Sequence, residues 1–379
     1  MSDSINSPAS AHVGYFDGLR AMATVCVIYM HTAAELLRTE VCFRWDLINI
    51  CTSFAFTAVP LFIMMSGYLL LSSERTTDVG FLLKRRLPRL AVPLAAWTVI
   101  EAFRTLLLQG NLTLRAFLSL MIDAIHNPIA VHFWYMYLAI ALYVISPMLW
   151  GALHALDRRG RRYLFALIVF ATVQTMASAV LPDNLDRLVA IDLAIRLKMW
   201  SGYLCTFFLG YLLGSTKRRI PNLVLFPAAA ALWAVIALGT RVLTLQNGEY
   251  TSTFQAQNAG FEVALAACLF LIFKQNARPF PLFRAVPLIP LCLPVYLMHN
   301  ILLSCFHHAG YYPGGFSDVL HMTLLNLVIC YFTTKTAASI RPLCFPLTGL
   351  TYQDACRSCN WQYTLHRIRS RLSGDSAQN

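Results

Sequence analysis

Ten separate runs of apolar residues constrain this chain more than any other feature. A helix that crosses the hydrocarbon core of a bilayer needs about 20 consecutive apolar residues. The runs lie near residues 14–37, 47–71, 88–108, 132–152, 163–181, 200–215, 222–244, 258–274, 285–306 and 320–340. Only 13% of the residues are charged, whereas soluble domains have about a quarter. We therefore expect an all-α polytopic membrane protein with about ten transmembrane helices.

The charge distribution predicts an orientation. Loops after the second, fourth, sixth and eighth runs hold fifteen Lys and Arg residues, and the alternate loops hold seven. Because basic loops stay on the cytoplasmic face, both termini should be cytoplasmic. The net charge of +12 therefore indicates membrane topology, and no nucleic acid partner is expected. The expected domains are a cytoplasmic segment 1–13, a transmembrane domain 14–345 and a basic cytoplasmic tail 346–379.

The first run carries ionisable residues at membrane depth. Arg20 and His31 are eleven positions apart, which is three helical turns plus about 20°, so both lie on one stripe about 16 Å apart. Asp17 lies one turn before Arg20, and Glu35 lies one turn beyond His31. The simple interpretation is that Arg20 reaches the interface and His31 fills a gap between helices. The functional interpretation is a polar cavity across the membrane, since such residues are functional candidates.

Two classes of protein fit a buried polar stripe. An arginine binds phosphates through forked hydrogen bonds, and a histidine removes a proton from a hydroxyl near neutral pH. These two groups suit an enzyme with a cytoplasmic donor and an acceptor reached from the outer side. A transporter or flippase of a glycan or lipid also carries polar residues within its spans. The absence of an inverted repeat in the sequence favours the enzyme.

Five motifs in order resemble the membrane-bound acyltransferase family 3, whose members often acylate sugars. "YFDGLRAMATVCVIYMHTA" (15–33) resembles its first-span arginine, ten residues, histidine. "VPLFIMMSGYLL" (59–70) and "FLLKRRLPRLAVP" (81–93) resemble its second-span and basic Arg-Arg-x-x-Arg motifs, although Pro88 interrupts the latter. "HFWYMYLAIALYVISPML" (132–149) and "VYLMHNILL" (295–303) resemble its later spans. Within the family, the second run is most similar to the branch that O-acetylates enterobacterial common antigen.

This resemblance implies transfer of an acyl group, usually acetyl, from an acyl-CoA to a hydroxyl of a glycan or lipid-linked sugar. It also implies an integral membrane enzyme of the bacterial inner membrane, with acyl-CoA as a substrate and no resident cofactor. The expected catalytic residues are ionisable groups in or beside the spans: His31, Glu35 and His299. The expected donor-binding residues are basic: Arg20, Arg85, Arg86 and Arg89. The expected acceptor-binding residues are aromatic: Trp134, Tyr135 and Tyr296, with membrane-interface anchoring as the alternative for Trp134 and Tyr135.

The remaining polar and small residues have simpler interpretations. Ser66 and Gly67 have no nearby base and should allow close helix packing. His132 is interpreted as a loop histidine, and His307 and His308 as solvated residues. The single CxxC of Cys356 and Cys359 is weak evidence for zinc, so no metal site is expected.

Overall fold

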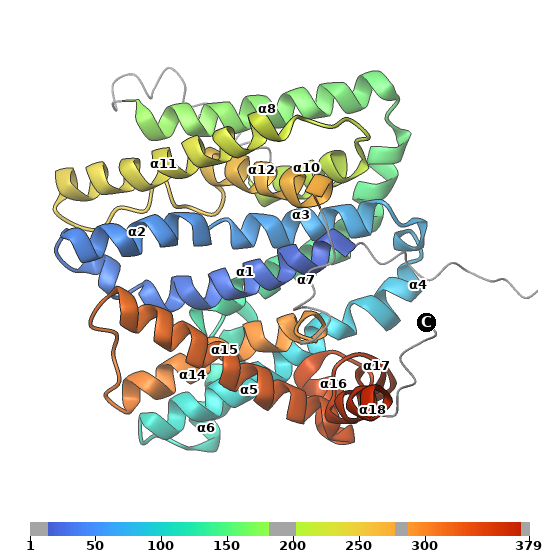
Figure 1. Ribbon diagram of the computed structural model, residues 1–379. Coiled ribbons are helices and arrows are strands. Elements are labelled where there is room, and N and C mark those ends of the chain that lie inside the picture. Colours follow the sequence, from blue (N-terminus) through green and yellow to red (C-terminus); the bar gives the residue numbers. More distant parts are fainter. Residues whose placement is uncertain (1–13, 182–201, 277–286, 373–379) are drawn as a thin grey trace, which may run out of the picture.

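The computed structural model describes residues 14–181, 202–276 and 287–372, and all regular structure in these residues is helical (Figure 1). The N-terminal half contains α1 Gly14–Ala33, η1 Leu36–Arg38, α2 Phe43–Ala55, α3 Ala58–Leu71, η2 Glu74–Thr76, α4 Val79–Phe81, η3 Leu82–Arg86, α5 Pro88–Leu108, α6 Leu114–His126, η4 Val131–Phe133, α7 Trp134–Ala155 and α8 Arg158–Val180. The C-terminal half contains α10 Tyr203–Ser215, α11 Asn222–Asn247, α12 Gly260–Asn276, η6 Ile289–Leu291, α14 Cys292–His308, α15 Phe316–Ser339, α16 Arg341–Thr348, α17 Tyr352–Ser358 and α18 Trp361–Leu372. The predicted all-α class is confirmed.

Seven helical stretches in the described part of the chain are long and apolar enough to cross a membrane. They are Phe43–Leu71, Val79–Leu108, Leu114–Ala155, Arg158–Val180, Asn222–Asn247, Ile289–His308 and Phe316–Ser339. Helices α1, α10 and α12 coincide with the other three predicted runs, but α10 and α12 have only 13 and 17 residues. The membrane class is thus supported, and the count of ten stays a prediction. Segment 1–13 and the starts of runs 200–215 and 285–306 lie outside the described residues.

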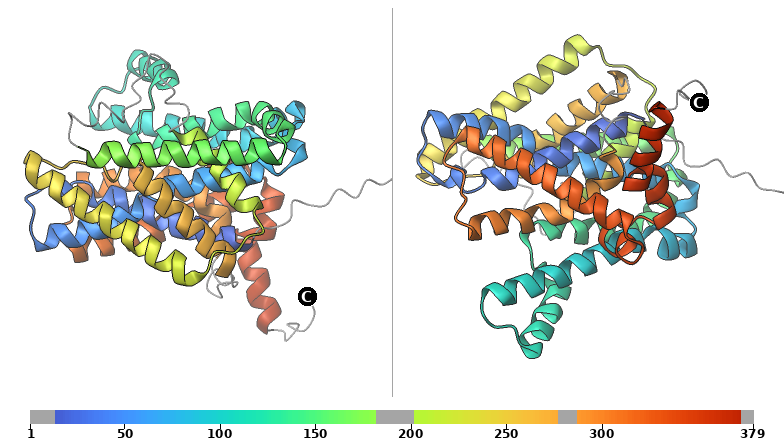
Figure 2. Two further views of the ribbon diagram at one scale, coloured as in Figure 1. Left: turned by 90° about the horizontal axis from the view of Figure 1, so that it is seen from above. Right: turned by 60° about the horizontal axis from the view of Figure 1, so that its bottom comes forward.

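Helix α1 occupies the centre of the bundle (Figure 1). It packs against α2, α3, α12, α14 and α15, so its side chains meet elements from most of the chain. Helices α8, α10, α11 and α12 lie on one side of the α1–α3 layer, and α5, α14 and α15 lie on the other (Figures 1 and 2). Contacts with both layers therefore fix the position of each residue of α1.

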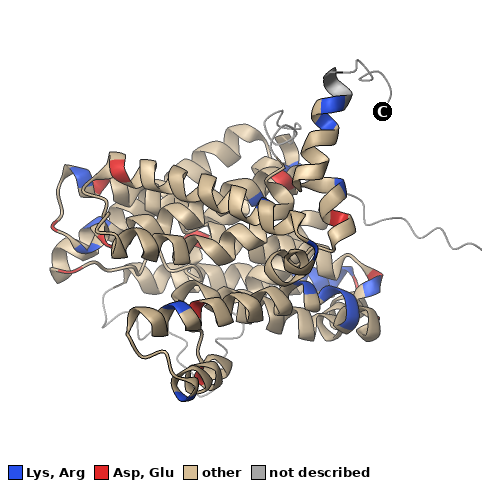
Figure 3. Ribbon diagram, turned by 90° about the horizontal axis from the view of Figure 1, so that it is seen from below, with Lys and Arg blue, Asp and Glu red and all other residues tan. Residues whose placement is uncertain are grey.

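Most charged residues gather at two opposite ends of the bundle, with largely uncharged helices between them (Figure 3). This is the pattern that a bilayer imposes, because charged side chains are costly in hydrocarbon. The start of α1, the basic η3 turn and the C-terminal helices lie at the same end (Figure 1). That these elements face the cytoplasm remains a prediction from the loop charges.

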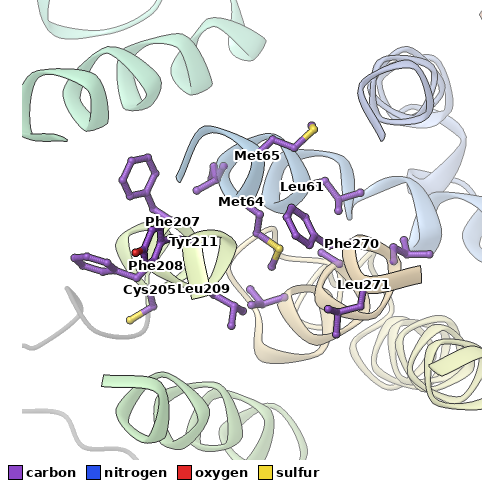
Figure 4. Packing of buried hydrophobic residues seen from close by; sticks show 14 of the residues in the cluster. Leu61, Met64, Met65, Cys205, Phe207, Phe208, Leu209, Tyr211, Phe270 and Leu271 are labelled. Carbon is purple, nitrogen blue, oxygen red and sulfur yellow. The ribbon is translucent and has the colours of Figure 1, made fainter. Parts of the chain in front are cut away.

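Close packing of α3 on α10 depends on glycines from both helices. A Cβ atom on Gly67 would lie 1.9 Å from the carbonyl oxygen of Phe207, and one on Gly210 would lie 2.1 Å from that of Met64. Phe207 and Met64 join Phe270 of α12 in one buried apolar cluster (Figure 4). The predicted packing role of Gly67 is confirmed, since small residues let two backbones approach closely.

The C-terminal segment is helical and folded against the bundle, whereas the sequence predicted a basic surface tail from residue 346 in which a short amphipathic helix could form. The Trp97 indole N–H of α5 donates to the carbonyl of Leu347, at 3.0 Å. Arg89 at the start of α5 forms a salt bridge with Asp354 of α17, with a distance of 3.1 Å between Nη2 and Oδ2. These contacts fix the tail beside the basic η3 turn.

We predict that Gly67→Ala destabilises the protein by about 1–3 kcal/mol, because the new methyl group meets a backbone atom that cannot move aside. The measurement is the thermal unfolding midpoint in detergent. Gly151→Ala in α7 is the control, since nothing lies within 4 Å of its Cβ position. Equal midpoints for the two variants would contradict the close approach of α3 and α10.

Candidate active site

Three histidines from distant parts of the chain meet at one place. The ring centroid of His31 in α1 lies 5.1 Å from that of His299 in α14 and 6.1 Å from that of His132 in η4. The His132 and His299 rings are 4.8 Å apart. The structure thus joins the predicted residues His31 and His299, and it adds a third imidazole that the sequence analysis had taken for a loop histidine. His132 is only 1% exposed.

Local sequence explains why these rings converge. Pro290 lies at the start of η6, where its missing N–H costs nothing, and α14 follows directly. Tyr296 and His299 are three residues apart on α14, so they share one face of that helix. The short turn η4 ends at Phe133 and leads directly into α7, which positions the His132 ring against this face.

Hydrogen bonds to backbone atoms hold two of the three rings. The Tyr296 hydroxyl donates to the carbonyl of His132, and the His132 Nε2 atom lies 3.1 Å from the carbonyl oxygen of Leu297. The His299 Nδ1 atom lies 2.5 Å from the carbonyl oxygen of Tyr296. Asn326 of α15 donates to the carbonyl of His299 at 2.8 Å. The rings are therefore fixed by α14 and α15 and not by loops alone.

The second ring nitrogen of each of these two histidines takes no part in these hydrogen bonds. His132 Nδ1 and His299 Nε2 have no hydrogen-bond partner among the described residues, although both side chains are buried. His31 keeps part of its surface accessible. Buried polar atoms are nearly always paired, so unpaired nitrogens around an accessible imidazole are typical of a substrate site.

The basic residues predicted for the donor divide into three environments. Arg86 in η3 points inward, where it donates to the hydroxyls of Thr76 and Ser73 at 2.9 and 3.1 Å. Arg85 is exposed, and Arg89 is paired with Asp354. In the described part of the chain no carboxylate forms an ion pair with Arg86.

Tyrosines connect this basic end to the histidines. The Tyr143 hydroxyl in α7 lies close enough to interact electrostatically with both Arg86 and Arg20. Tyr135, two turns earlier in α7, lies near Tyr143, Arg20 and Ser66. Its ring centroid is 5.7 Å from that of Tyr296, which in turn lies 5.7 Å from that of His299. Polar side chains of α7 and α14 thus lie between η3 and the histidine cluster.

Arg20 lies near the tyrosines of α7. Its guanidinium carbon is 6.0 Å from the ring centroid of Phe16, one turn earlier in α1. The sequence suggested that it pairs with Asp17, but the described residues form no ion pair with Arg20. Asp17 has contacts of its own. Arg20 is partly accessible, as are Tyr135 and Tyr143.

Trp134 lies at the side of the cluster. Its ring centroid is 5.5 Å from that of Tyr203 in α10 and 6.3 Å from that of Tyr135. Trp134 and Tyr203 are both partly buried and pack against the same apolar cluster. Trp134 is therefore part of the helix packing and keeps one side open.

Glu35 is not positioned as the sequence predicted. Helix α1 ends at Ala33, so the helical spacing that would stack Glu35 over His31 does not continue. The Glu35 carboxylate instead lies 3.4 Å from Nδ1 of His307. His307 also stacks on Tyr312, with centroids 4.7 Å apart, so the prediction that it is simply solvated is wrong. Its neighbour His308 is exposed, as expected.

The structure contains one buried acid that the sequence patterns did not predict. Glu262 in the first turn of α12 is fully buried, and neither carboxylate oxygen has a partner among the described residues. It is near Cys26 of α1 and Tyr250. No motif or spacing marked it, because a single glutamate at the start of an apolar run looks like an interfacial residue.

Cys356 of the CxxC lies in α17, and Cys359 caps the C-terminal end of that helix. In the described residues, no group of three or more His, Cys, Asp or Glu side chains is arranged to hold a metal ion. Burial raises the pKa of the Cys359 thiol to about 11, so it stays protonated. Cys356 accepts a hydrogen bond from Asn360. Both cysteines of the CxxC thus serve the packing of the tail.

Comparison with known proteins identifies the family. The acyltransferase domain that defines acyltransferase family 3 matches residues 13–335, which is most of the chain. The chain therefore belongs to this family of integral membrane acyltransferases. The match does not distinguish branches within the family. No curated protein and no solved structure matches the chain.

We predict that Tyr296→Phe weakens the histidine cluster, because it leaves the buried carbonyl of His132 without its donor. The expected cost in stability is about 1–3 kcal/mol, with slower acyl transfer because His132 is less firmly held. Thermal unfolding and the transfer rate test this. Tyr163→Phe, on the exposed surface of α8, is the control. If both variants match the wild-type protein, the hydroxyl has no positioning role.

Proposed function

We propose that this protein transfers an acyl group, most simply acetyl, from a cytoplasmic acyl-CoA to a hydroxyl of a glycan or lipid-linked sugar. The observation that carries the proposal is the set of polar side chains between the inward-facing Arg86 and the three histidines. Family membership supports the reaction class. A bacterial inner membrane is the location proposed for it.

The donor would enter at the basic end. Arg86 and the exposed Arg85 are suited to the phosphates of an acyl-CoA, since guanidinium groups form forked hydrogen bonds with phosphate. Arg89 would contribute only if it exchanged Asp354 for the ligand. The uncharged chain that links the phosphates of the donor to its thioester would then lie along Tyr143, Arg20 and Tyr135 toward His31. Arg20 and His31 are about 16 Å apart along α1. The donor therefore needs a long, flexible chain to reach from one to the other.

His31 would perform the chemistry at the far end of this path. As a general base it takes the proton of the acceptor hydroxyl while the oxygen attacks the thioester carbonyl. The carbon–sulfur bond breaks, and the thiolate of CoA leaves and is protonated. In the other route, the imidazole attacks first and an acyl-histidine forms before the acceptor arrives. An acyl-histidine trapped in the absence of acceptor would identify the second route.

The remaining residues have supporting roles in this proposal. His299 and His132 have unpaired nitrogens beside His31, which suits them to orient the acceptor hydroxyl or the His31 ring. Trp134 and Tyr135 offer aromatic faces, which commonly stack on sugar rings. Tyr296 is the third aromatic residue proposed for the acceptor, although its hydroxyl is already used by His132. We do not retain Glu35 as a catalytic residue, because its carboxylate faces His307.

We predict that His31→Ala abolishes transfer of radiolabelled acetyl from acetyl-CoA to a glycan or lipid fraction of membranes that express the protein. The expected loss is at least 100-fold, the usual contribution of a positioned base. The exposed His308→Ala variant, at matched expression, should retain wild-type activity. Full activity in His31→Ala would refute the assignment of His31.

A second prediction separates two neighbouring arginines. Arg86→Gln should raise the KM for acyl-CoA about 10-fold or more, since a hydrogen bond to a charged group contributes about 1.5–3 kcal/mol. Arg85→Gln should have a smaller effect because Arg85 is solvated. Initial rates against donor concentration measure this, with the unfolding midpoint as a check on Arg86→Gln. Equal KM values for both variants would argue against an inward donor path.

A further inference from the structure

The last helix, α18, has an apolar stripe that is largely exposed in the part of the chain that the structure describes. Trp361, Leu365 and Ile368 are spaced by four and three residues, so they share one face. Leu365 is 54% exposed and Ile368 is 49% exposed. The helix also carries Arg367 and Arg369, and no acidic residue occurs between Arg357 and Leu372. An exposed apolar stripe beside basic residues is typical of a helix that lies in a membrane interface.

The position of α18 fits that environment. The helix lies at the end of the bundle that carries the basic η3 turn (Figures 1 and 3). It runs across the long direction of the bundle and not along it, as the left view of Figure 2 shows. Since the transmembrane helices run along that direction, α18 lies roughly parallel to the plane of a membrane around them.

The start of α18 is anchored to a surface that faces lipid. The Trp361 ring stacks on Phe332 of α15, with centroids 5.9 Å apart and planes 11° apart. Phe332 is on a transmembrane helix and is 47% exposed. The Trp361 indole N–H donates to Thr336 at 3.1 Å, and Lys335 lies 4.3 Å from the centre of the Trp361 ring. The apolar stripe of α18 is therefore continuous with the lipid-facing surface of α15.

We propose that α18 binds the anionic headgroups of the membrane in which the protein resides. The continuity of the stripe with Phe332 identifies the bilayer as the occupant, because a soluble partner would not cover a surface that extends onto a transmembrane helix. The arginines identify the headgroup charge, since basic residues at a membrane surface attract anionic lipids. Trp361, at the junction of α18 and α15, agrees with this position of α18, because tryptophan side chains are enriched at the level of the headgroups.

Helix α6 provides an internal comparison. Its apolar stripe is as exposed as that of α18, with Leu114, Leu118, Ile122 and Ile125 on the surface. However, its charges balance, with Arg115 and Asp123 as its only charged residues apart from a terminal histidine. α6 should therefore contact lipid without preferring anionic headgroups, whereas α18 should prefer them.

The test is amide hydrogen exchange of the full chain in nanodiscs of phosphatidylcholine, alone or mixed with phosphatidylglycerol. Exchange in the segment 361–372 should slow when phosphatidylglycerol is present, and exchange in 114–126 should not change. Replacing Arg367 and Arg369 by Gln should reduce this slowing about fivefold for each arginine. High salt should reduce it as well. Inorganic phosphate added to phosphatidylcholine nanodiscs should not slow exchange, which separates a lipid surface from a free anion.

A second variant tests the apolar stripe. Leu365→Asn combined with Ile368→Asn should restore fast exchange in 361–372 while exchange in α3 stays unchanged, which shows that the bundle is folded. Equal exchange of α18 in the two lipid compositions would overturn the proposal. It would also be overturned if the Asn variant stayed as protected as the wild-type chain, because protein contacts alone would then order the helix.

Discussion

The hydrocarbon of a bilayer offers no hydrogen-bond partner, so every polar group within it must find one in the protein. This constraint explains why the described chain is helical and why its charges lie at the two ends of the bundle. It also explains the construction of the site. The Tyr296 hydroxyl donates to the carbonyl of His132, and the Asn326 amide donates to the carbonyl of His299. The carbonyls of Leu297 and Tyr296 are hydrogen-bond partners of the His132 and His299 rings. Among the described residues of this cluster, one nitrogen each on His132 and His299 has no partner, as the proposed substrate site requires.

The central position of α1 gives this arrangement its precision. A helix that contacts five others cannot rotate without disturbing all of them, since protein interiors are closely packed. The spacing of Arg20 and His31 is thus converted into a fixed separation in space. His31 meets α14 and η4 from one layer, while the other layer holds α1 in place through α3 and α12. Catalytic groups on such an element keep their geometry better than groups on loops.

Sequence patterns predicted features that one helix or one short motif encodes. The runs that contain the spans, the stripe of Arg20 and His31 and the packing role of Gly67 are of this kind. The position of His132 could not be predicted in this way. It depends on how the turn before α7 packs against α14, and no local sequence pattern indicates that contact. Glu35 failed for a related reason: the spacing argument assumed a helix to residue 37, but α1 ends at Ala33. The docking of the tail also depends on a long-range pair, Arg89 and Asp354.

The three arginines near the start of α5 show how backbone geometry places the residues of one motif in different environments. Arg85 and Arg86 lie in the π-helical turn η3, a conformation often found at functional sites. There, adjacent residues face solvent and the bundle interior. Pro88 then begins α5, where a missing N–H is tolerated, and the change of helix type directs Arg89 toward Asp354. A proline within the basic motif therefore does not disrupt the site. Arg89 pairs with Asp354 of the tail, while Arg86 faces the bundle interior.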